Sequence, residues 1–362
     1  MSASDQGKAR AGNFFEDFTL GQVIRHATPR TIDAGEVALY TALYGPRFAV
    51  QSSAEFARAL GYRTAPIDDL LVFHIVFGKS VPDVSLNAVA NLGYAECRFL
   101  APVYPGDTLR SQSRVIGLKQ NSSGKTGIVY VRTTGTRQDG VPVVEFTRWV
   151  MVRKHDPGAP APDPVVPELA ERVAPADLVL PQGVTWDGWN ADESGSHAFW
   201  DDYAVGERID HRDAMTITEA EHMLATRLYQ NTARVHFNRH QAAKGRFGQP
   251  IVYGGHVISL ARALSFNGLA NGALIAAVNA GSHVAPAFAG DTVYGWSEII
   301  ERAELPGRSD VGALRIRTIA TKDRVCDDFP GRDADGKYDE AVLLDFDYWA
   351  WMPRRGQPET DH

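Results

Sequence analysis

Residues 14–21, which read FFEDFTLG, recur in diverged form at residues 199–206 as FWDDYAVG. The aromatic residues, one aspartate and the closing glycine keep a spacing of 185 positions. Further downstream, the turn at residues 105–108 (PGDT) matches residues 289–292 (AGDT) at almost the same offset. Matches that hold one offset over this length indicate a diverged internal duplication, so we expect two modules with the same fold.

A proline-rich segment separates the two copies. Residues 156–167 read DPGAPAPDPVVP, with five prolines in twelve residues. Proline fixes φ and lacks a backbone donor, so this segment should be extended and non-helical. We therefore divide the 362 residues into a first module over 12–155, a linker over 156–177 and a second module over 178–355, each long enough to bury its own core.

The order of predicted elements is the same in both modules. A helix should begin near Asp33 and near Thr218, and a second, apolar helix should follow each of them. In the second copy the apolar positions Val257, Leu260, Ala261 and Leu264 predict a helix that buries one face. Runs of residues that favour β-strands then predict strands over 127–134, 141–152, 313–321 and 342–351. One central helix followed by several strands favours the α+β class, with an antiparallel sheet wrapped over the helix.

Composition and charge exclude several classes of partner. The formal net charge is −7, so nothing favours general attraction to nucleic acid or to an anionic membrane. The apolar stretches 70–77 and 257–280 are too short or too interrupted to span a bilayer, and the N-terminus lacks a signal-peptide core. Cys97 and Cys326 are far apart in the sequence and form neither a disulfide framework nor a metal-ligand cluster, so we expect two reduced thiols. We therefore expect a cytoplasmic protein.

The second module carries the residues that could perform chemistry. Residues 227–238 read RLYQNTARVHFN, and residues 250–256 read PIVYGGH. Here the chain resembles the MaoC-like, R-specific enoyl-CoA hydratases of the hot-dog fold. In that family a Gly-Asp-x-Asn-Pro-x-His stretch supplies an aspartate and a histidine five positions apart, and a glycine-rich turn that opens the central helix supplies an oxyanion donor. The resemblance implies a double hot-dog fold with its active site in the second copy.

A closer resemblance covers almost the whole chain. Residues 227–238, the Gly254-Gly255-His256 turn and residues 70–79 (LLVFHIVFGK) are similar to the mesaconyl-CoA hydratases, also called β-methylmalyl-CoA dehydratases. The resemblance implies reversible hydration of mesaconyl-CoA (2-methylfumaryl-CoA) to β-methylmalyl-CoA, in acetyl-CoA and glyoxylate assimilation of the ethylmalonyl-CoA pathway type. It implies an acyl-CoA thioester as the partner and no cofactor, since CoA is part of the substrate. We also expect a homo-oligomer.

The residues of the motif suit this chemistry. Hydration of an enoyl thioester needs a base for the water and donors for the thioester oxygen, where enolate charge develops. His236 is the predicted base, because an unperturbed imidazole is largely neutral at pH 7. Backbone N–H groups at Gly254 or Gly255 are the predicted oxyanion donors, because a helix N-terminus presents unpaired N–H groups.

The substrate-binding residues are predicted from their position beside the motif. Tyr229 and Tyr253 flank it on either side. A dicarboxylic acyl group calls for a cation, and Arg234 or Arg227 could clamp its free carboxylate.

One position departs from the family pattern. Asn231 stands where the family has its aspartate, and Ala233 where it has an asparagine. An asparagine amide can position a water but cannot accept its proton at pH 7. Either His236 handles more of the proton transfer, or a carboxylate elsewhere helps.

The first module has lost the motif. Pro46 stands in place of Asn231 and Gln51 in place of His236, while Leu70 or its neighbour Asp69 stands where the oxyanion glycine should be. That copy has no base. We interpret it as structural, which leaves one active site per chain.

Simpler interpretations exist for single residues. His236 could be a satisfied polar residue, His236 and His240 could be a metal pair without a third ligand, and His74 could be a core histidine. The two glycines could form an ordinary turn and Arg234 could be a solvated charge, while Arg262 could bind a CoA phosphate or pair with the other module. The alternative functions are a hydratase for another branched or dicarboxylic enoyl-CoA, a thioesterase, or a non-catalytic acyl-CoA-binding protein.

Overall fold

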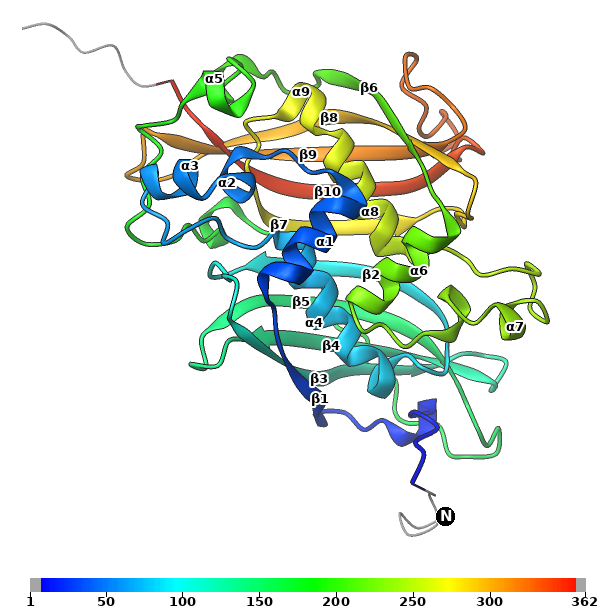
Figure 1. Ribbon diagram of the computed structural model, residues 1–362. Coiled ribbons are helices and arrows are strands. Elements are labelled where there is room, and N and C mark those ends of the chain that lie inside the picture. The colour runs from blue at the N-terminus through cyan, green and yellow to red at the C-terminus, as the bar shows by residue number, and fades with distance from the viewer. Residues whose placement is uncertain (1–7, 356–362) are drawn as a thin grey trace, which may run out of the picture.

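The computed structural model describes residues 8–355, and their ten strands form one antiparallel sheet (Figure 1). The strand order is β1-β3-β4-β5-β2-β7-β10-β9-β8-β6, so the second five strands repeat the order of the first five from the opposite edge. The copies join where β2 pairs with β7, through Cys97 opposite Val278 and Arg98 opposite Ala277. The strands are β1 (Val23–Thr31), β2 (Ala88–Phe99), β3 (Thr108–Gln120), β4 (Thr126–Thr136), β5 (Pro142–Arg153), β6 (Arg208–Thr216), β7 (Leu274–His283), β8 (Thr292–Glu304), β9 (Val311–Lys322) and β10 (Val342–Pro353).

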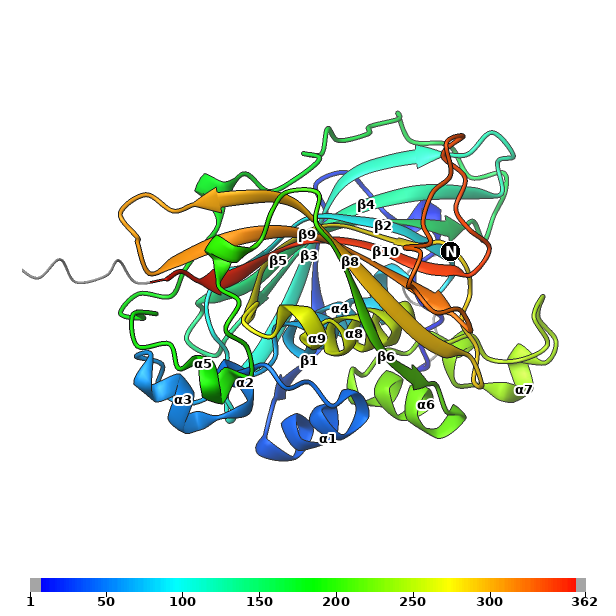
Figure 2. The same ribbon diagram turned by 90° about the horizontal axis from the view of Figure 1, so that it is seen from above.

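The α-helices that cover the sheet lie on one of its faces (Figure 2). The longest is α4, and it lies beside α8 against the sheet, one from each copy. This arrangement confirms the predicted α+β double hot-dog fold. No helix in the described part of the chain is long and apolar enough to cross a membrane. The helices are α1 (Ala34–Tyr44), α2 (Ala49–Ser52), α3 (Ala54–Ala59), α4 (Asp69–Val84), α5 (Ala191–Ser194), α6 (Glu219–Leu228), α7 (Arg239–Ala242), α8 (Gly254–Leu264) and α9 (Phe266–Leu269), with 3₁₀ turns at η1 (Phe15–Asp17), η2 (Pro175–Asp177), η3 (Trp200–Asp202) and η4 (Arg234–His236).

The helices α1 and α6 begin where the sequence predicts. Asp33 and Thr218 are their N-caps, and each forms a capping box with the glutamate three residues later, Glu36 or Glu221. These reciprocal bonds satisfy backbone donors that the first helical turn leaves unpaired. The predicted strands also match, since β4, β9 and β10 each contain the corresponding run, and β5 begins one residue after the start of its run, at Pro142.

The central helix α8 is buried on every side, so the expectation of a single buried face is wrong. All residues from Gly255 to Leu264 are buried. The sheet covers one side of α8, and α1 and α6 pack against it as well. Its polar positions are therefore satisfied internally, as where Ser259 accepts from Tyr40 at 3.0 Å and contacts His74 at 3.1 Å.

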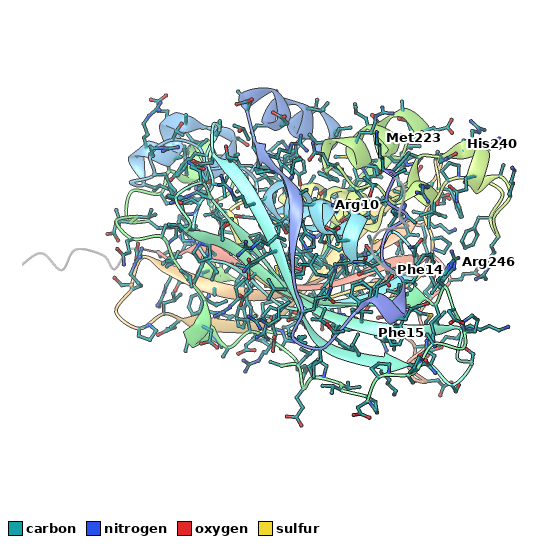
Figure 3. All side chains as sticks on the ribbon, turned by 90° about the horizontal axis from the view of Figure 1, so that it is seen from below. Arg10, Phe14, Phe15, Met223, His240 and Arg246 are labelled. Atoms are coloured by element: carbon teal, nitrogen blue, oxygen red, sulfur yellow. The ribbon has the colours of Figure 1, made fainter. Side chains whose placement is uncertain are left out.

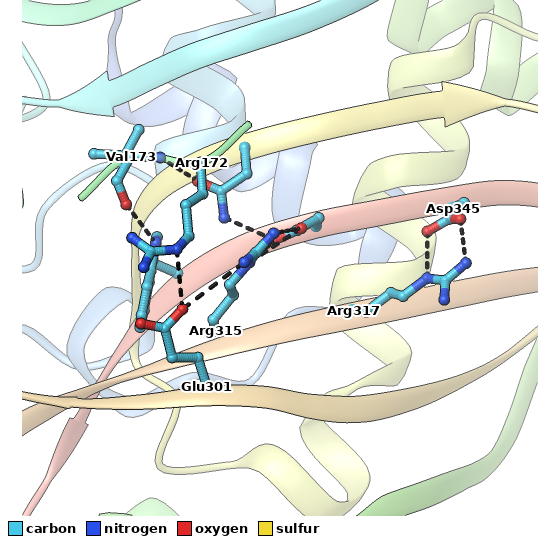
Figure 4. A network of polar contacts seen from close by, with 9 residues as sticks. Arg172, Val173, Glu301, Arg315, Arg317 and Asp345 are labelled. Atoms are coloured by element: carbon cyan, nitrogen blue, oxygen red, sulfur yellow. Dashed lines mark hydrogen bonds and ion pairs between the residues drawn. The ribbon is translucent and has the colours of Figure 1, made fainter. Parts of the chain in front are cut away.

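The opposite face of the sheet carries ion pairs that cross neighbouring strands (Figure 4). Arg315 and Arg317 of β9 bind Asp347 and Asp345 of β10, each pair at 2.6 Å. The chain that connects the copies is attached to the same network, since Arg172 pairs with Glu301 of β8 at 3.1 Å. Residues 156–174 contain no helix. The domain boundaries at 155 and 178 stay a prediction, since β5 ends at Arg153 and β6 begins only at Arg208.

Candidate active site

The two motif strings meet at the N-terminal end of α8. After α6 the chain turns through η4, which contains His236, and returns to Tyr253, the N-cap of α8. The backbone N–H of Ile251 donates to the carbonyl of Val235 at 3.2 Å, which closes this loop. The rings of His236 and Tyr253 then lie 5.5 Å apart, centroid to centroid. The structure thus brings the predicted base beside the predicted oxyanion glycines.

The hydrogen bonding of His236 prepares it to act as a base. Its Nδ1 donates to the carbonyl oxygen of Ile251 at 3.0 Å. A carbonyl only accepts, so in the neutral ring Nδ1 carries the proton and Nε2 keeps its lone pair. The ring is half-buried. The desolvation lowers the pKa of His236 to about 4, against the opposing effect of the Ile251 bond. His236 is therefore neutral at pH 7.

Gly254 and Gly255 allow other groups to approach the first turn of α8 closely. A Cβ on Gly254 would collide with the imidazole of His283, with Nδ1 at 2.7 Å. A Cβ on Gly255 would collide with the rings of Tyr253 and His74. The N–H groups of a first helical turn have no partner within the helix. Glycine at these two positions therefore allows the rings of His283, Tyr253 and His74 to lie against the start of α8.

His283 belongs to the site, although sequence reasoning missed it. It is the last residue of β7, and its ring lies against Gly254 and 6.1 Å from the ring of Tyr94. The ring is exposed, yet the protein around it lowers its pKa to about 4, first by desolvation and then through the charge of His236. No local pattern in the sequence marks this histidine, because its contact with Gly254 arises only where β7 ends beside the start of α8.

Asn231 is buried, with an exposed fraction of 4%, and its orientation is fixed. Its Oδ1 accepts the backbone N–H of Ala233 at 2.9 Å. Its backbone packs closely against Gly78 of α4, where a Cβ would collide with the carbonyl oxygen of Tyr229. The first copy therefore positions the catalytic loop of the second.

The two predicted substrate-binding tyrosines differ in their surroundings. The hydroxyl of Tyr229 lies 2.7 Å from that of Tyr44, which lies 2.9 Å from Nδ1 of His256. Burial raises the pKa of Tyr229 well above its usual range, so it remains a neutral phenol. Tyr253 instead packs beside His236 and the ring of Phe77, at 5.5 and 5.9 Å. Tyr229 thus belongs to a buried network, while Tyr253 lies at the base itself.

His74 has the character of a core histidine. It is fully buried in α4, and its pKa falls to about 3 because burial disfavours the charged ring. Its Nε2 lies 3.1 Å from the hydroxyl of Ser259. It therefore joins the central helices of the two copies.

The matching region of the first copy has no histidine, and its place is taken by an amide beside a buried carboxyl group. The Gln51 amide donates to Oδ2 of Asp69 at 3.1 Å, and the N–H of Ile275 donates to the same oxygen at 3.0 Å. Burial, followed by the neighbouring charge of Asp68, raises the pKa of Asp69 to about 8. An amide and a carboxyl group thus hold each other at the place where the second copy has His236 and Gly254.

The arginine candidates divide by burial. Arg227 and Arg234 are exposed, and no ion pair of either occurs among residues 8–355. Arg262 is buried, with its guanidinium 3.5 Å from the ring centroid of Phe48 and a bond to the carbonyl of Gly272. The interpretation of Arg262 as a CoA-phosphate ligand is therefore wrong. It joins the modules through an aromatic ring.

No metal pair forms at His236 and His240. His240 is exposed at the outer edge of the molecule, on the same side of the view as Arg246 (Figure 3). Within the part of the chain that the structure describes, no group of three or more histidine, cysteine or acidic side chains could hold a metal ion.

Comparisons with known proteins show the family of the chain. The family model described as mesaconyl-CoA hydratase matches residues 2–334. The chain is 65% identical to the β-methylmalyl-CoA dehydratase of Chloroflexus aurantiacus, covering 96% of this chain and 99% of that protein. It is 58% identical to the mesaconyl-CoA hydratase of Cereibacter sphaeroides, covering 96% of this chain and all of that protein.

Solved structures give the same fold. A putative MaoC domain protein dehydratase from Chloroflexus aurantiacus superposes with a TM-score of 0.95 at 64% identity, covering 97% of this chain and all of that one. A conserved hypothetical protein of Mycobacterium tuberculosis, described as a double hotdog fold, reaches 0.71 at 24% identity, covering 94% of this chain and 98% of that one. At that identity the second likeness shows the fold alone.

Proposed function

Because the chain belongs to the mesaconyl-CoA hydratase family, we propose that it catalyses the reversible hydration of mesaconyl-CoA to β-methylmalyl-CoA. This is a hydro-lyase reaction on an enoyl-CoA thioester. The observation that carries the proposal is the position of His236, a neutral imidazole with a free Nε2, beside the glycine-rich start of α8.

The geometry supports a one-base addition of water. Nε2 of His236 takes a proton from water while the water oxygen bonds to the β-carbon. The electron pair of the double bond moves toward the thioester oxygen, where N–H groups of Gly254 and Gly255 stabilise the enolate. The imidazolium then returns its proton to the α-carbon, the double bond is consumed, and His236 is neutral again.

The reaction needs no further group. One water is added and no electrons leave the substrate, so we expect no cofactor beyond the CoA that the substrate carries. We also propose that the enzyme acts in the cytoplasm, in acetyl-CoA and glyoxylate assimilation of the ethylmalonyl-CoA pathway type, and assembles as a homo-oligomer.

One assay separates the proposed activity from its alternatives. Purified protein is mixed with 2-methylfumaryl-CoA, while the enoyl-thioester absorbance and free CoA are followed together. Loss of absorbance without release of CoA is the expected result. Release of CoA would indicate a thioesterase, and no change in either signal would indicate a binding protein. Crotonyl-CoA hydrated faster than 2-methylfumaryl-CoA would point to a different enoyl-CoA substrate.

A further inference from the structure

We propose that Asn231 selects acyl groups that carry a carboxylate on the carbon attacked by water. The inference rests on the proposed function and deepens it. In this view the asparagine is a specificity residue, and not a degraded form of the family aspartate.

The chemistry of the substrate places its charge next to the catalytic loop. In 2-methylfumaryl-CoA the free carboxylate is bonded directly to the β-carbon, the atom that receives the water. The base that activates this water must lie within hydrogen-bond reach, so the carboxylate comes close to whatever surrounds His236. Asn231 precedes His236 by five positions in the same loop. A group at position 231 is therefore suited to sense this charge.

The orientation of Asn231 fixes which atom it can offer. Its Oδ1 is occupied by the N–H of Ala233 at 2.9 Å, so Nδ2 is the other end of the amide. Among residues 8–355, no group accepts a hydrogen bond from this Nδ2. This Nδ2 is not one of the fully buried polar atoms that lack a partner, so it offers an accessible donor, for which a carboxylate is a strong acceptor. The fixed amide thus offers a donor that an anionic acyl group can use.

An aspartate at position 231 would have the opposite effect. One of its oxygens could still accept the N–H of Ala233, because aspartate and asparagine have the same shape. The other oxygen would place negative charge where Nδ2 now lies, in a site 4% exposed. Two carboxylates brought together in low-dielectric surroundings repel each other strongly. At position 231 of this chain, aspartate would therefore disfavour a dicarboxylic acyl group, whereas asparagine accommodates it.

The two histidines and the two exposed arginines of this region do not supply a buried cation to the loop. His236 and His283 are both neutral at pH 7, because the surrounding protein holds each pKa near 4. Arg227 and Arg234 are exposed, and charge pairs in water contribute little. Arg148 is a buried cation, but it donates to Ser80 at 2.8 Å and lies over the ring of Phe77 at 4.2 Å. Position 231 is thus the place in the loop itself where a fixed donor can discriminate.

The test compares two substrates across matched variants. The Asn231→Asp variant should lose kcat/KM on 2-methylfumaryl-CoA relative to crotonyl-CoA, shifting the ratio by roughly 10- to 100-fold. Asn231→Ala removes the donor without adding charge, so its ratio should shift in the same direction but less. Asn190→Asp is the control, since Asn190 lies outside the motif and caps α5 through the same kind of bond, by accepting the N–H of Asp192 at 3.1 Å. The ratio of its kcat/KM values on the two substrates should stay within about twofold of the wild-type ratio.

Several outcomes would overturn the inference. Equal losses on both substrates by Asn231→Asp, with an unchanged melting temperature, would show that the residue serves catalysis and not selection. The preference for 2-methylfumaryl-CoA over crotonyl-CoA could instead disappear in Arg234→Met or Arg227→Met and persist in Asn231→Asp. That result would assign the binding of the carboxylate to an arginine. If Asn231→Asp does not fold, Asn231→Ala decides alone, and an unchanged ratio contradicts the inference. Failure of the wild-type protein to hydrate 2-methylfumaryl-CoA would instead refute the proposed function.

Discussion

The imidazole of His283 lies directly on the backbone of Gly254, so that a Cβ at position 254 would place Nδ1 of the ring only 2.7 Å away. The two residues come from different elements, the end of β7 and the start of α8. Only a glycine permits this approach, since real Cβ contacts are never so short. The contact connects the proposed oxyanion donors with an accessible histidine, and it can be tested directly.

Gly254→Ala should lower kcat/KM for hydration by roughly 100-fold or more, because the methyl group displaces His283 and obstructs the oxyanion donors. Its melting temperature should fall as well. In a His283→Ala background the same substitution should cost little stability, because the clashing ring is gone. A double-mutant cycle from denaturant unfolding measures this coupling, and additive effects would show that the two residues do not interact.

His236→Ala should abolish hydration while leaving the fold intact. Removal of a general base costs roughly 100-fold or more in rate. Activity is measured by loss of enoyl-thioester absorbance and folding by circular dichroism. A variant with more than about a tenth of the wild-type kcat would exclude His236 as the base.

The acid limb of the pH profile should lie well below the usual histidine range. Only neutral His236 can accept a proton, and its pKa is lowered to about 4. The value of kcat/KM should therefore stay constant from pH 7 down to about 5 and fall as the pH passes through about 4. Returning the enzyme from low pH to pH 7 before assay separates this titration from unfolding. A limb near pH 6.5 would mean that the desolvation of His236 has little effect in the free enzyme.

Stability should follow pH through the buried histidines. Burial lowers the pKa of His74 and of His256 to about 3, below the unfolded value near 6.5. Between these two pH values, the unfolded chain therefore binds more protons than the folded one. The free energy of unfolding is then greatest above pH 6.5 and declines as the pH falls toward 3. Urea unfolding from pH 8 to pH 4 measures the decline. A His74→Gln variant should show a shallower dependence than the wild type.

The first copy should contribute structure without chemistry. Gln51→Ala removes the residue that matches His236, and it should leave kcat within about twofold because no base is lost there. Gly78→Ala should reduce activity strongly, since its Cβ would collide with Tyr229 in the loop that leads to Asn231. Gly35→Ala is the control, because nothing lies within 4 Å of its added Cβ. Equal effects of the two glycine substitutions would remove the support for this contact.

Much of this protein could be derived from its sequence, because the signals are local. Capping boxes at Asp33 and Thr218 mark helix starts, since the side chains that satisfy the first turn are near neighbours in the chain. The strands follow from β-rich runs, and the duplication predicts the repeated strand order. The site loop was also predictable, because Asn231 and His236 stand in one short stretch that resembles a known motif.

Only the tertiary structure decided which distant residues share that site. His283 approaches Gly254 because β7 ends beside the start of α8, and no local pattern encodes that contact. The burial of α8 on all sides depends on helices packed over it, so its own periodicity could not show it. Likewise, the pKa of His236 and the orientation of Asn231 arise from desolvation and from bonds made by the folded loop. Sequence determines local conformation, while proximity between distant segments arises only when the chain buries its apolar surface.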